Sequence, residues 1–465
     1  MKDEGAPLLH DSGLGGILDL FDAAVPYEFF RQMEKDLKLP ARRRVFNLPL
    51  VVWLMIAQRL DAKATMSTAV QQVAQQRPQV LLTDHKRNRE GTVSCHTGAY
   101  SDARQAMPVQ VAERVADRIF DHLLLSRREA LPGFSRHVFV LDGSSVEAPH
   151  TPELVKAFPP ARNQHGESHW PVLRLLVADE LTTGLAERPC WGPMYGPDAV
   201  SEQELTESIL DRLPDAAVVM GDINFGVFTV ALAVAQRGYE QLFRLLPTRA
   251  KAIGHGLPLL PGTDAPVCWQ PSVYERRRHP ALPADACVRG RLIVRQVVAS
   301  NGASSILYFF TTLELGVEHI LQLYGQRWDI ETDLRSLKQT LNLQMLRCQS
   351  VDMVAKELVL AVVGYNLVRA VMNVAAEQND LDPRRLSFSR SQDVVNAALP
   401  GLDAARTPQT YQARIQKMLR LVASCKLPDR SCRSTTPRHV WGHSCKFPKR
   451  KAIVPTQNCQ SEPTR

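Results

Sequence analysis

The sequence predicts an α/β protein with a sheet-containing core and helical regions at both ends. Residues 1–130 show helical periodicity and no strong strand pattern. Short apolar runs rich in β-branched residues begin near residue 137, and a long apolar helical stretch follows residue 350. The 465 residues suffice for two to four structural units, and 45% hydrophobic with 22% charged residues is ordinary for a soluble protein.

The first 130 residues predict a compact helical bundle. Leu48–Leu60 has the composition of an apolar helix core, and the polar stretch 83–92 interrupts the helical pattern. We expect further helices at 66–75, 101–107 and 108–125.

The middle of the chain alternates between strand and helix signals. The apolar run 137–141 ends in Asp142, and the run 216–220 is followed by Gly221 and Asp222. Ser201 and Glu204 form the capping-box pattern that opens a helix. We expect strands at 137–141, 172–178, 216–220 and 241–246, and helices at 201–213 and 226–236.

Residues 247–299 are rich in Pro, Gly and Arg, which indicates an inserted segment. Runs at 291–298 and 305–310 predict strands that pair with each other, so the insertion should be β-rich. A long apolar helix at 354–376, polar helices and a basic tail complete the chain.

The segment Tyr324–Lys338 predicts one amphipathic helix with an unusual polar face. At about 100° per residue, one stripe roughly 80° wide collects a phenol, a carboxylate and three cations. These are Tyr324, Arg327, Glu331, Arg335 and Lys338. A carboxylate binds a metal ion while cations bind phosphate, so the stripe suits both ligands. The alternative is a solvated face with intrahelical ion pairs, such as Glu331 with Arg327 or Arg335.

Three carboxylates occur in the order strand, strand, helix. Asp142 and Asp222 each follow an apolar strand, and Glu331 lies on the amphipathic segment. Strands of one α/β sheet bring their terminal residues to a common crevice. Three carboxylates there need a cation, and oxygen ligands favour Mg²⁺ or Mn²⁺, with two ions suited to phosphodiester chemistry. This order matches a ribonuclease-H-like sheet, although an aspartate after a strand is more often a turn or cap residue.

The charge distribution and the cysteine content limit which binding partners and which cellular compartment we expect. From residue 401 onward there are 13 Lys and Arg against 3 Asp and Glu, which suits a polyanionic partner such as nucleic acid; a solubilising tail is the alternative. Nine scattered cysteines suggest reduced thiols. The start Met1–Glu4 lacks a signal-peptide core and we found no apolar run of about 18 residues, so we expect a cytoplasmic protein without a membrane partner.

A group of potential zinc ligands lies near the C-terminus. Its members are Cys425, Cys432, His439, His443 and Cys445. The two histidines have plausible spacing, but the cysteines form no tight pair. Accidental Cys and His residues in a basic tail are the simpler account.

The spacing Tyr324-x₂-Arg327-x₃-Glu331-x₆-Lys338 resembles the Tyr-Arg-Glu-Lys signature of a large family of bacterial insertion-sequence transposases with an Asp-Asp-Glu site, the insertion-sequence-four type. Four other segments resemble the same family, and the resemblance covers roughly residues 40 to 450. They are Tyr100–Arg104, Val140–Ser144, Val219–Phe225 and Tyr365–Arg369. The family often has Arg directly after the second Asp, where this chain has Ile223.

The resemblance implies a ribonuclease-H-like catalytic core with a β-rich insertion, flanked by helical N-terminal and C-terminal regions. Asp142, Asp222 and Glu331 would be the catalytic metal ligands, for probably two Mg²⁺ or Mn²⁺ ions. Tyr324, Arg327 and Lys338 would hold the DNA backbone. Arg335 lies outside the signature and is a potential ion-pair partner of Glu331. In relatives a Trp of the insertion can stack on a flipped base; Trp269 is the candidate here, against the alternative of a core Trp.

The implied function is transposition: cleavage at transposon ends and joining of the freed 3′-OH to target DNA, by a homodimer in the bacterial cytoplasm. Two alternatives remain, a catalytically silent DNA-binding relative and a stand-alone metal-dependent nuclease on the same fold. The expected domains are a helical DNA-binding region at 1–130, the first part of the core at 131–247, the insertion at 248–315, the Glu-bearing part at 316–376 and a basic region at 377–465.

Overall fold

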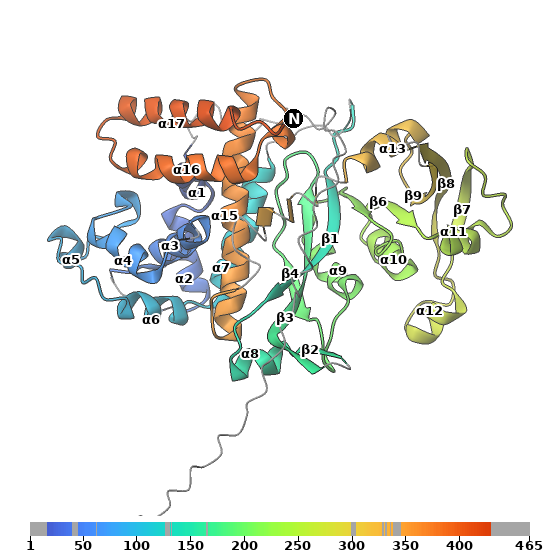
Figure 1. Ribbon diagram of the computed structural model, residues 1–465, viewed down its shortest axis with the longest axis horizontal. Coiled ribbons are helices and arrows are strands. Elements are labelled where there is room, and N and C mark those ends of the chain that lie inside the picture. The colour runs from blue at the N-terminus through green and yellow to red at the C-terminus, as the bar shows by residue number, and fades with distance from the viewer. Residues whose placement is uncertain are drawn as a thin grey trace, which may run out of the picture.

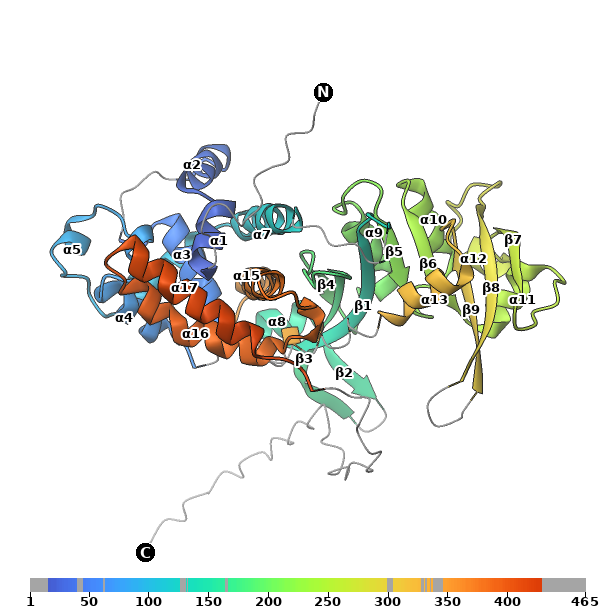
Figure 2. The same ribbon diagram turned by 90° about the horizontal axis from the view of Figure 1, so that it is seen from above.

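The computed structural model describes residues 16–39, 45–61, 63–125, 131, 133–163, 166–298, 304–327, 330, 333–334, 336–337 and 346–428. Along the longest axis, a helical body is followed by the central strands and then by the inserted strands (Figure 1). The N-terminal and C-terminal helices share the helical body, although they are far apart in the sequence (Figures 1 and 2).

Residues 1–130 are helical where the structure describes them. Their elements are α1 (Ile17–Ala24), α2 (Tyr27–Asp36), α3 (Leu48–Leu60), α4 (Met66–Ala74), the 3₁₀ turn η1 (Gln79–Leu81), α5 (Lys86–Arg89), α6 (Gly98–Ala106) and α7 (Val109–Leu124). The four predicted helices form as α3, α4, α6 and α7 with ends shifted by up to three residues, whereas α1, α2 and η1 were not predicted individually. The short helix α5 lies within the polar stretch where we expected none. Asn47 begins α3 by accepting a hydrogen bond from the backbone of Leu50.

The C-terminal helices pack against this bundle. They are α15 (Val351–Glu377), the 3₁₀ turn η3 (Pro383–Arg385), α16 (Phe388–Asp403) and α17 (Pro408–Ala423). The hydroxyl of Tyr411 on α17 donates to the carboxylate of Asp19 on α1 at 2.7 Å. This contact ties the two ends of the described chain together.

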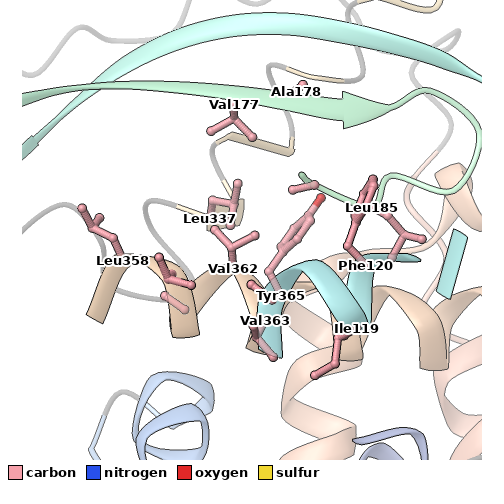
Figure 3. Packing of buried hydrophobic residues seen from close by; sticks show 14 of the residues in the cluster. Ile119, Phe120, Val177, Ala178, Leu185, Leu337, Leu358, Val362, Val363 and Tyr365 are labelled. Carbon is pink, nitrogen blue, oxygen red and sulfur yellow. The ribbon is translucent and has the colours of Figure 1, made fainter. Parts of the chain in front are cut away.

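Helix α15 is the centre of the molecule. Among the described residues it is the one helix long and apolar enough to cross a membrane, and our reading that the chain has no such run is corrected accordingly. Its apolar window is completely buried within the protein, against α3, α7 and α17. Buried side chains from α7, α15 and the strand β3 meet in one core, where Phe120, Val177 and Tyr365 lie close together (Figure 3).

The strands form one mixed sheet in the order β2-β3-β1-β5-β6-β9-β8-β7, with β4 paired to β3. They are β1 (Val138–Glu147), β2 (Pro160–Asn163), β3 (Gly166–Glu180), β4 (Cys190–Pro193), β5 (Val218–Gly221), β6 (Glu240–Leu245), β7 (Asp264–Trp269), β8 (Val288–Val298) and β9 (Ser304–Thr311). The path β4-β3-β1-β5-β6 is antiparallel up to β1 and parallel from β1 to β6. This is the ribonuclease-H-like arrangement, so the predicted fold class is confirmed.

The two faces of the central sheet carry different helices. The helices α9 (Glu202–Leu210) and α10 (Phe228–Gln236) pack on one face, against β3, β4 and β6. Residues of α13 (Val317–Gly325) pack in a second apolar cluster with Val138, Val140 and Met220. Because side chains alternate along a strand, residues at every second position of β1 and β5 face α13.

The insertion extends the sheet. Strand β9 pairs antiparallel with β6, and β8 pairs with both β9 and β7, so the predicted pairing of the two longer strands is confirmed. Three short helices were not predicted: α8 (Pro152–Ala157), α11 (Pro247–Gly254) and α12 (Val273–Arg278). The strands β2, β4 and β7 were also missed, because each has only four to six residues and little alternation.

Candidate active site

Two predicted carboxylates lie at corresponding positions of the adjacent parallel strands β1 and β5, with Asp142 within β1 and Asp222 directly after β5. Strands β1 and β5 pair in register up to Val140 opposite Met220, and two residues further along lie Asp142 and Asp222. The aspartates follow Val140 and Met220 by two residues, and Val140 and Met220 face α13. Strand β1 continues to Glu147, so Asp142 lies within a strand and not at its end as the apolar run predicted.

Burial changes the chemistry of Asp142. Its pKa is raised from 3.8 to about 6 in total, with desolvation by burial as the largest cause. The nearby carboxylate of Asp222 also raises this pKa, whereas a hydrogen bond from the Gly143 backbone and the Arg327 guanidinium oppose the rise. The Gly143 N–H donates to Oδ1 of Asp142 at 2.9 Å. A bound cation would relieve the electrostatic repulsion between the carboxylates of Asp142 and Asp222.

Asp222 begins a tight turn between β5 and α10. Its Oδ1 accepts a hydrogen bond from the backbone N–H of Asn224 at 2.8 Å, and its carbonyl oxygen accepts from Phe225 and Gly226. The turn fixes the backbone of Asp222 while Ile223 occupies the position where the resembled family often has Arg. The hydrogen bonds described here that hold Asp222 come from the backbone of Asn224, Phe225 and Gly226, and they do not involve the side chain of Ile223.

A further carboxylate, Glu202, which was not predicted from the sequence, approaches the site from α9. Arg174 on β3 donates to its Oε1 at 3.3 Å, and the Asn224 side-chain amide donates to Oε2. A Cβ added to Gly143 would lie 2.0 Å from Cδ of Glu202, so this approach needs glycine directly after Asp142. The capping box at Ser201 was the available signal, because it fixes Glu202 in the first helical turn.

Tyr324 interacts electrostatically with Asp222 and Arg327 with Asp142, but these two residues do not lie on one continuous helix. Helix α13 ends at Gly325 and Arg327 lies in the following turn, so the prediction of a single helix through this segment is wrong. Both side chains are buried, at 8% and 7% exposure, and not part of an open polar stripe. The Arg327 guanidinium lies 5.8 Å from the centre of the Tyr324 ring, which packs edge-on against Phe309.

Burial raises the pKa of the Tyr324 phenol, and the cations of Arg327 and Arg244 oppose this rise. The phenol therefore stays protonated at neutral pH and can donate a hydrogen bond. The pKa perturbations place Arg327 within electrostatic reach of Asp142 and Tyr324 within reach of Asp222.

Glu331, Arg335 and Lys338 lie outside the described residues, so their predicted places are not tested. Five neighbours are described and buried: Ile330, Asp333, Leu334, Ser336 and Leu337. Ile330 belongs to the apolar cluster of Tyr324, whereas Leu334 and Leu337 join the core that contains α15. The apolar side of the predicted amphipathic pattern is therefore buried as expected.

The insertion tryptophan lies in the core. Trp269 is 2% exposed, and its ring packs against Phe310 at 4.9 Å and Phe228 at 6.1 Å between centroids. This burial matches the core alternative and offers no open ring face to a base. We therefore do not include Trp269 among the DNA contacts proposed below.

The potential zinc ligands gain no support. In the part of the chain that the structure describes, no group of three or more His, Cys, Asp or Glu residues could hold a metal ion. Cys425 is buried, and the other four members of the group lie outside the described residues, as does the basic cluster Lys446–Lys451.

Comparisons with known proteins identify the family. A family model described as a transposase DDE domain matches residues 133–367, half of the chain, including all three predicted catalytic carboxylates. The chain belongs to this transposase family. The transposase InsG of insertion sequence element IS4 from Escherichia coli (strain K12) is 26% identical over 453 residues, which cover 94% of this chain and 95% of that protein. The resemblance to insertion-sequence transposases is thus confirmed.

Among solved structures, a piggyBac transposase synaptic complex with hairpin DNA is similar at a TM-score of 0.39 and 9% identity, over 91% of this chain and 87% of that one. The fold assignment here depends on the strand order and not on this distant likeness. As a member of the DDE family related to IS4, the chain is a transposase, an enzyme that cleaves and transfers DNA strands. Members of this family generally use divalent metal ions.

Proposed function

We propose that this transposase cuts DNA at the ends of its own insertion sequence and joins the freed 3′-OH to target DNA, in a cut-and-paste reaction. Asp142, Asp222 and Glu331 are the proposed catalytic residues. The observation that carries the proposal is the placement of Asp142 and Asp222 at corresponding positions of adjacent strands, with Arg327 nearby. A pair of neighbouring carboxylates with a cation beside it suits phosphodiester chemistry.

The donor set fits magnesium or manganese. The proposed ligands are carboxylate oxygens, which hard divalent cations prefer, and the Asp142 pKa of about 6 shows how strongly the site disfavours uncompensated negative charge. We propose two ions held by Asp142, Asp222 and Glu331. When bound, they would lower the pKa of the attacking hydroxyl and neutralise charge at the scissile phosphate.

The chain's own cations and phenol would position the DNA. Arg327 and Lys338 offer charge-assisted hydrogen bonds to phosphate oxygens, and the protonated Tyr324 hydroxyl offers a neutral one. In the first step water attacks phosphorus at the transposon end, and the 3′-oxygen leaves with a proton as the free 3′-OH. In the second step this 3′-OH attacks a target phosphodiester, and the target 3′-oxygen leaves.

The remaining parts of the chain would serve DNA binding and assembly. We propose that the N-terminal helices bind the transposon ends and that the basic C-terminal region adds phosphate contacts. Cutting two ends together requires at least two catalytic sites, so we propose a homodimer in the synaptic complex. The reaction would take place in the bacterial cytoplasm, on nucleoid DNA.

The test is a cleavage and joining assay with purified protein, DNA carrying the inverted repeats that flank the gene, and Mg²⁺ or Mn²⁺. The wild type should give cut ends and joined products, whereas Glu331→Gln should bind the same DNA without cutting it. Cutting without joining would instead identify a nuclease. Binding without cutting by the wild type would identify a catalytically silent relative.

A further inference from the structure

We propose that Asp333, held between Arg369 and Arg384, is a positioning residue that fixes the segment carrying Glu331 for DNA cleavage. This inference rests on the proposed function. Asp333 follows Glu331 by two residues and is 1% exposed. The Nη2 atom of Arg369 donates to its Oδ1, and the Nη2 atom of Arg384 donates to its Oδ2 at 2.5 Å.

Arg369 is held in place by its own surroundings. Its Nε donates to the Tyr365 hydroxyl at 2.8 Å, one turn earlier on α15. Its guanidinium lies 5.2 Å from the centre of the Tyr365 ring and 5.3 Å from that of Phe388, and these two rings stack at 4.9 Å. The guanidinium is thus oriented by two rings and a hydroxyl. Asp333 meets a rigid partner, so its position is determined by α15 and α16.

Arg384 reaches Asp333 from the 3₁₀ turn η3 by passing a glycine. A Cβ on Gly184 would lie 2.1 Å from Nη1 of Arg384, and Gly184 has a φ of +69°, which favours glycine. The same loop is docked on α15, because the Asn366 side chain exchanges two hydrogen bonds of 2.8 Å with the backbone of Ala186. The loop after β3, α15 and η3 therefore meet at Asp333.

The cluster of Asp333, Arg369 and Arg384, which we call the clamp, also borders strand β3, the partner of β1, on which Asp142 lies. Asp179 on β3 lies opposite Val140 on β1, two residues before Asp142. Asp179 is 2% exposed and neither carboxylate oxygen has a hydrogen-bond partner among the described residues, while burial and the nearby Asp333 raise its pKa. Both arginines donate to Asp333 and no described donor reaches Asp179, so the cations of this cluster are directed at Asp333. One buried cluster thus joins the strand pair β1–β3 to the Glu331 segment.

The magnitude follows from the geometry that catalysis requires. A misplacement of about 1 Å in a catalytic group can cost on the order of 10²-fold in rate. Asp333→Asn removes the charge that both guanidinium groups bind, so the single-turnover rate of end cleavage should fall about 10²-fold. Affinity for end DNA should stay within about twofold, because the clamp is buried away from solvent.

The control is a second buried ion pair on the same helix. Arg59 on α3 binds Glu357 on α15 at 2.7 Å, with exposures of 7% and 3%. Arg59→Gln breaks a pair of similar burial and should lower thermal stability without slowing cleavage per folded molecule. Arg369→Lys keeps a charge but not the planar fork, so it should recover only part of the rate. Arg384→Gln, whose side chain is 11% exposed, serves if Asp333→Asn does not fold.

A general loss of stability would raise hydrogen–deuterium exchange throughout the protein, whereas loss of the contacts of Asp333 should raise it selectively in the peptide 326–340. Asp333→Asn or Arg384→Gln should raise exchange there, whereas Arg59→Gln should not. Unchanged exchange in this peptide, or equal cleavage losses in the clamp and control variants, would overturn the inference. If the wild type itself does not cut DNA, the proposed function fails, and exchange alone decides whether the clamp exists.

Discussion

The close approach of Glu202 to Gly143 gives a sharp test of the site geometry. In Gly143→Ala, the new methyl group would lie 2.0 Å from Cδ and 2.1 Å from Oε1 of Glu202, so the glutamate must move. The end of a glutamate is flexible, so the steric cost is small. The larger cost is the loss of the hydrogen bonds from Arg174 and Asn224.

The expected destabilisation is about 1.5 kcal/mol, at the low end for hydrogen bonds to a charged group because the Glu202 side chain is 18% exposed. The effect on cleavage should be larger, on the order of 10²-fold, because Asn224 also holds Asp222 in its turn. The assay is single-turnover cleavage of end DNA beside chemical unfolding.

The control is Gly401→Ala, since nothing lies within 4 Å of the added Cβ. It should leave cleavage unchanged and stabilise α16 slightly, by about 0.5–1 kcal/mol. In the double variant Gly143→Ala with Glu202→Ala, the collision is absent, so this variant should cut no more slowly than Glu202→Ala alone. Wild-type cleavage by Gly143→Ala, or an additive loss in the double variant, would refute this reasoning.

Three further predictions follow from the same structure. In metal-free protein, Asp142→Asn should be more stable than the wild type at pH 7–8 by up to about 3 kcal/mol, and the difference should vanish near pH 4. The reason is that the folded-state pKa of Asp142, about 6, exceeds 3.8, so the stability that protonated Asp142 contributes to the wild type is lost as pH rises through 6. Thermal melts in EDTA measure the difference. Trp269→Ala should destabilise by about 3–5 kcal/mol in urea titrations while DNA affinity per folded molecule is unchanged; a selective loss of affinity would contradict its role in the core. Tyr411→Phe should lower stability by about 1.5 kcal/mol through loss of the bond to Asp19, and an unchanged melting temperature would contradict it.

The sequence predicted the parts of the fold that depend on periodicity. Leu48–Leu60 and the buried helix around Tyr365 have long, regular apolar patterns, and both helices form where expected. Short elements such as β4 and α11 were missed, because hydrogen bonding to neighbours and not their own composition decides them. The expected domain limits remain a prediction.

The site was predicted in part. Asp142 and Asp222 were predicted because each follows an apolar run that indicates a strand. In the structure β1 continues past Asp142, because pairing with β3 extends the strand beyond its apolar run. The break after Gly325 was not visible in a pattern that fits one helix. Glu202 was missed because its partners Arg174 and Asn224 lie 28 and 22 residues away, and only folding brings them together.

The central claim is that Asp142, Asp222 and Glu331 carry out metal-dependent cutting and joining of DNA. The most direct measurement is a gel assay of wild type and Glu331→Gln with DNA bearing the flanking inverted repeats, with Mg²⁺ or EDTA. We expect cut and joined products only for wild type with Mg²⁺, and equal DNA binding by both proteins. Cutting by Glu331→Gln at the wild-type rate, or cutting in EDTA, would contradict it.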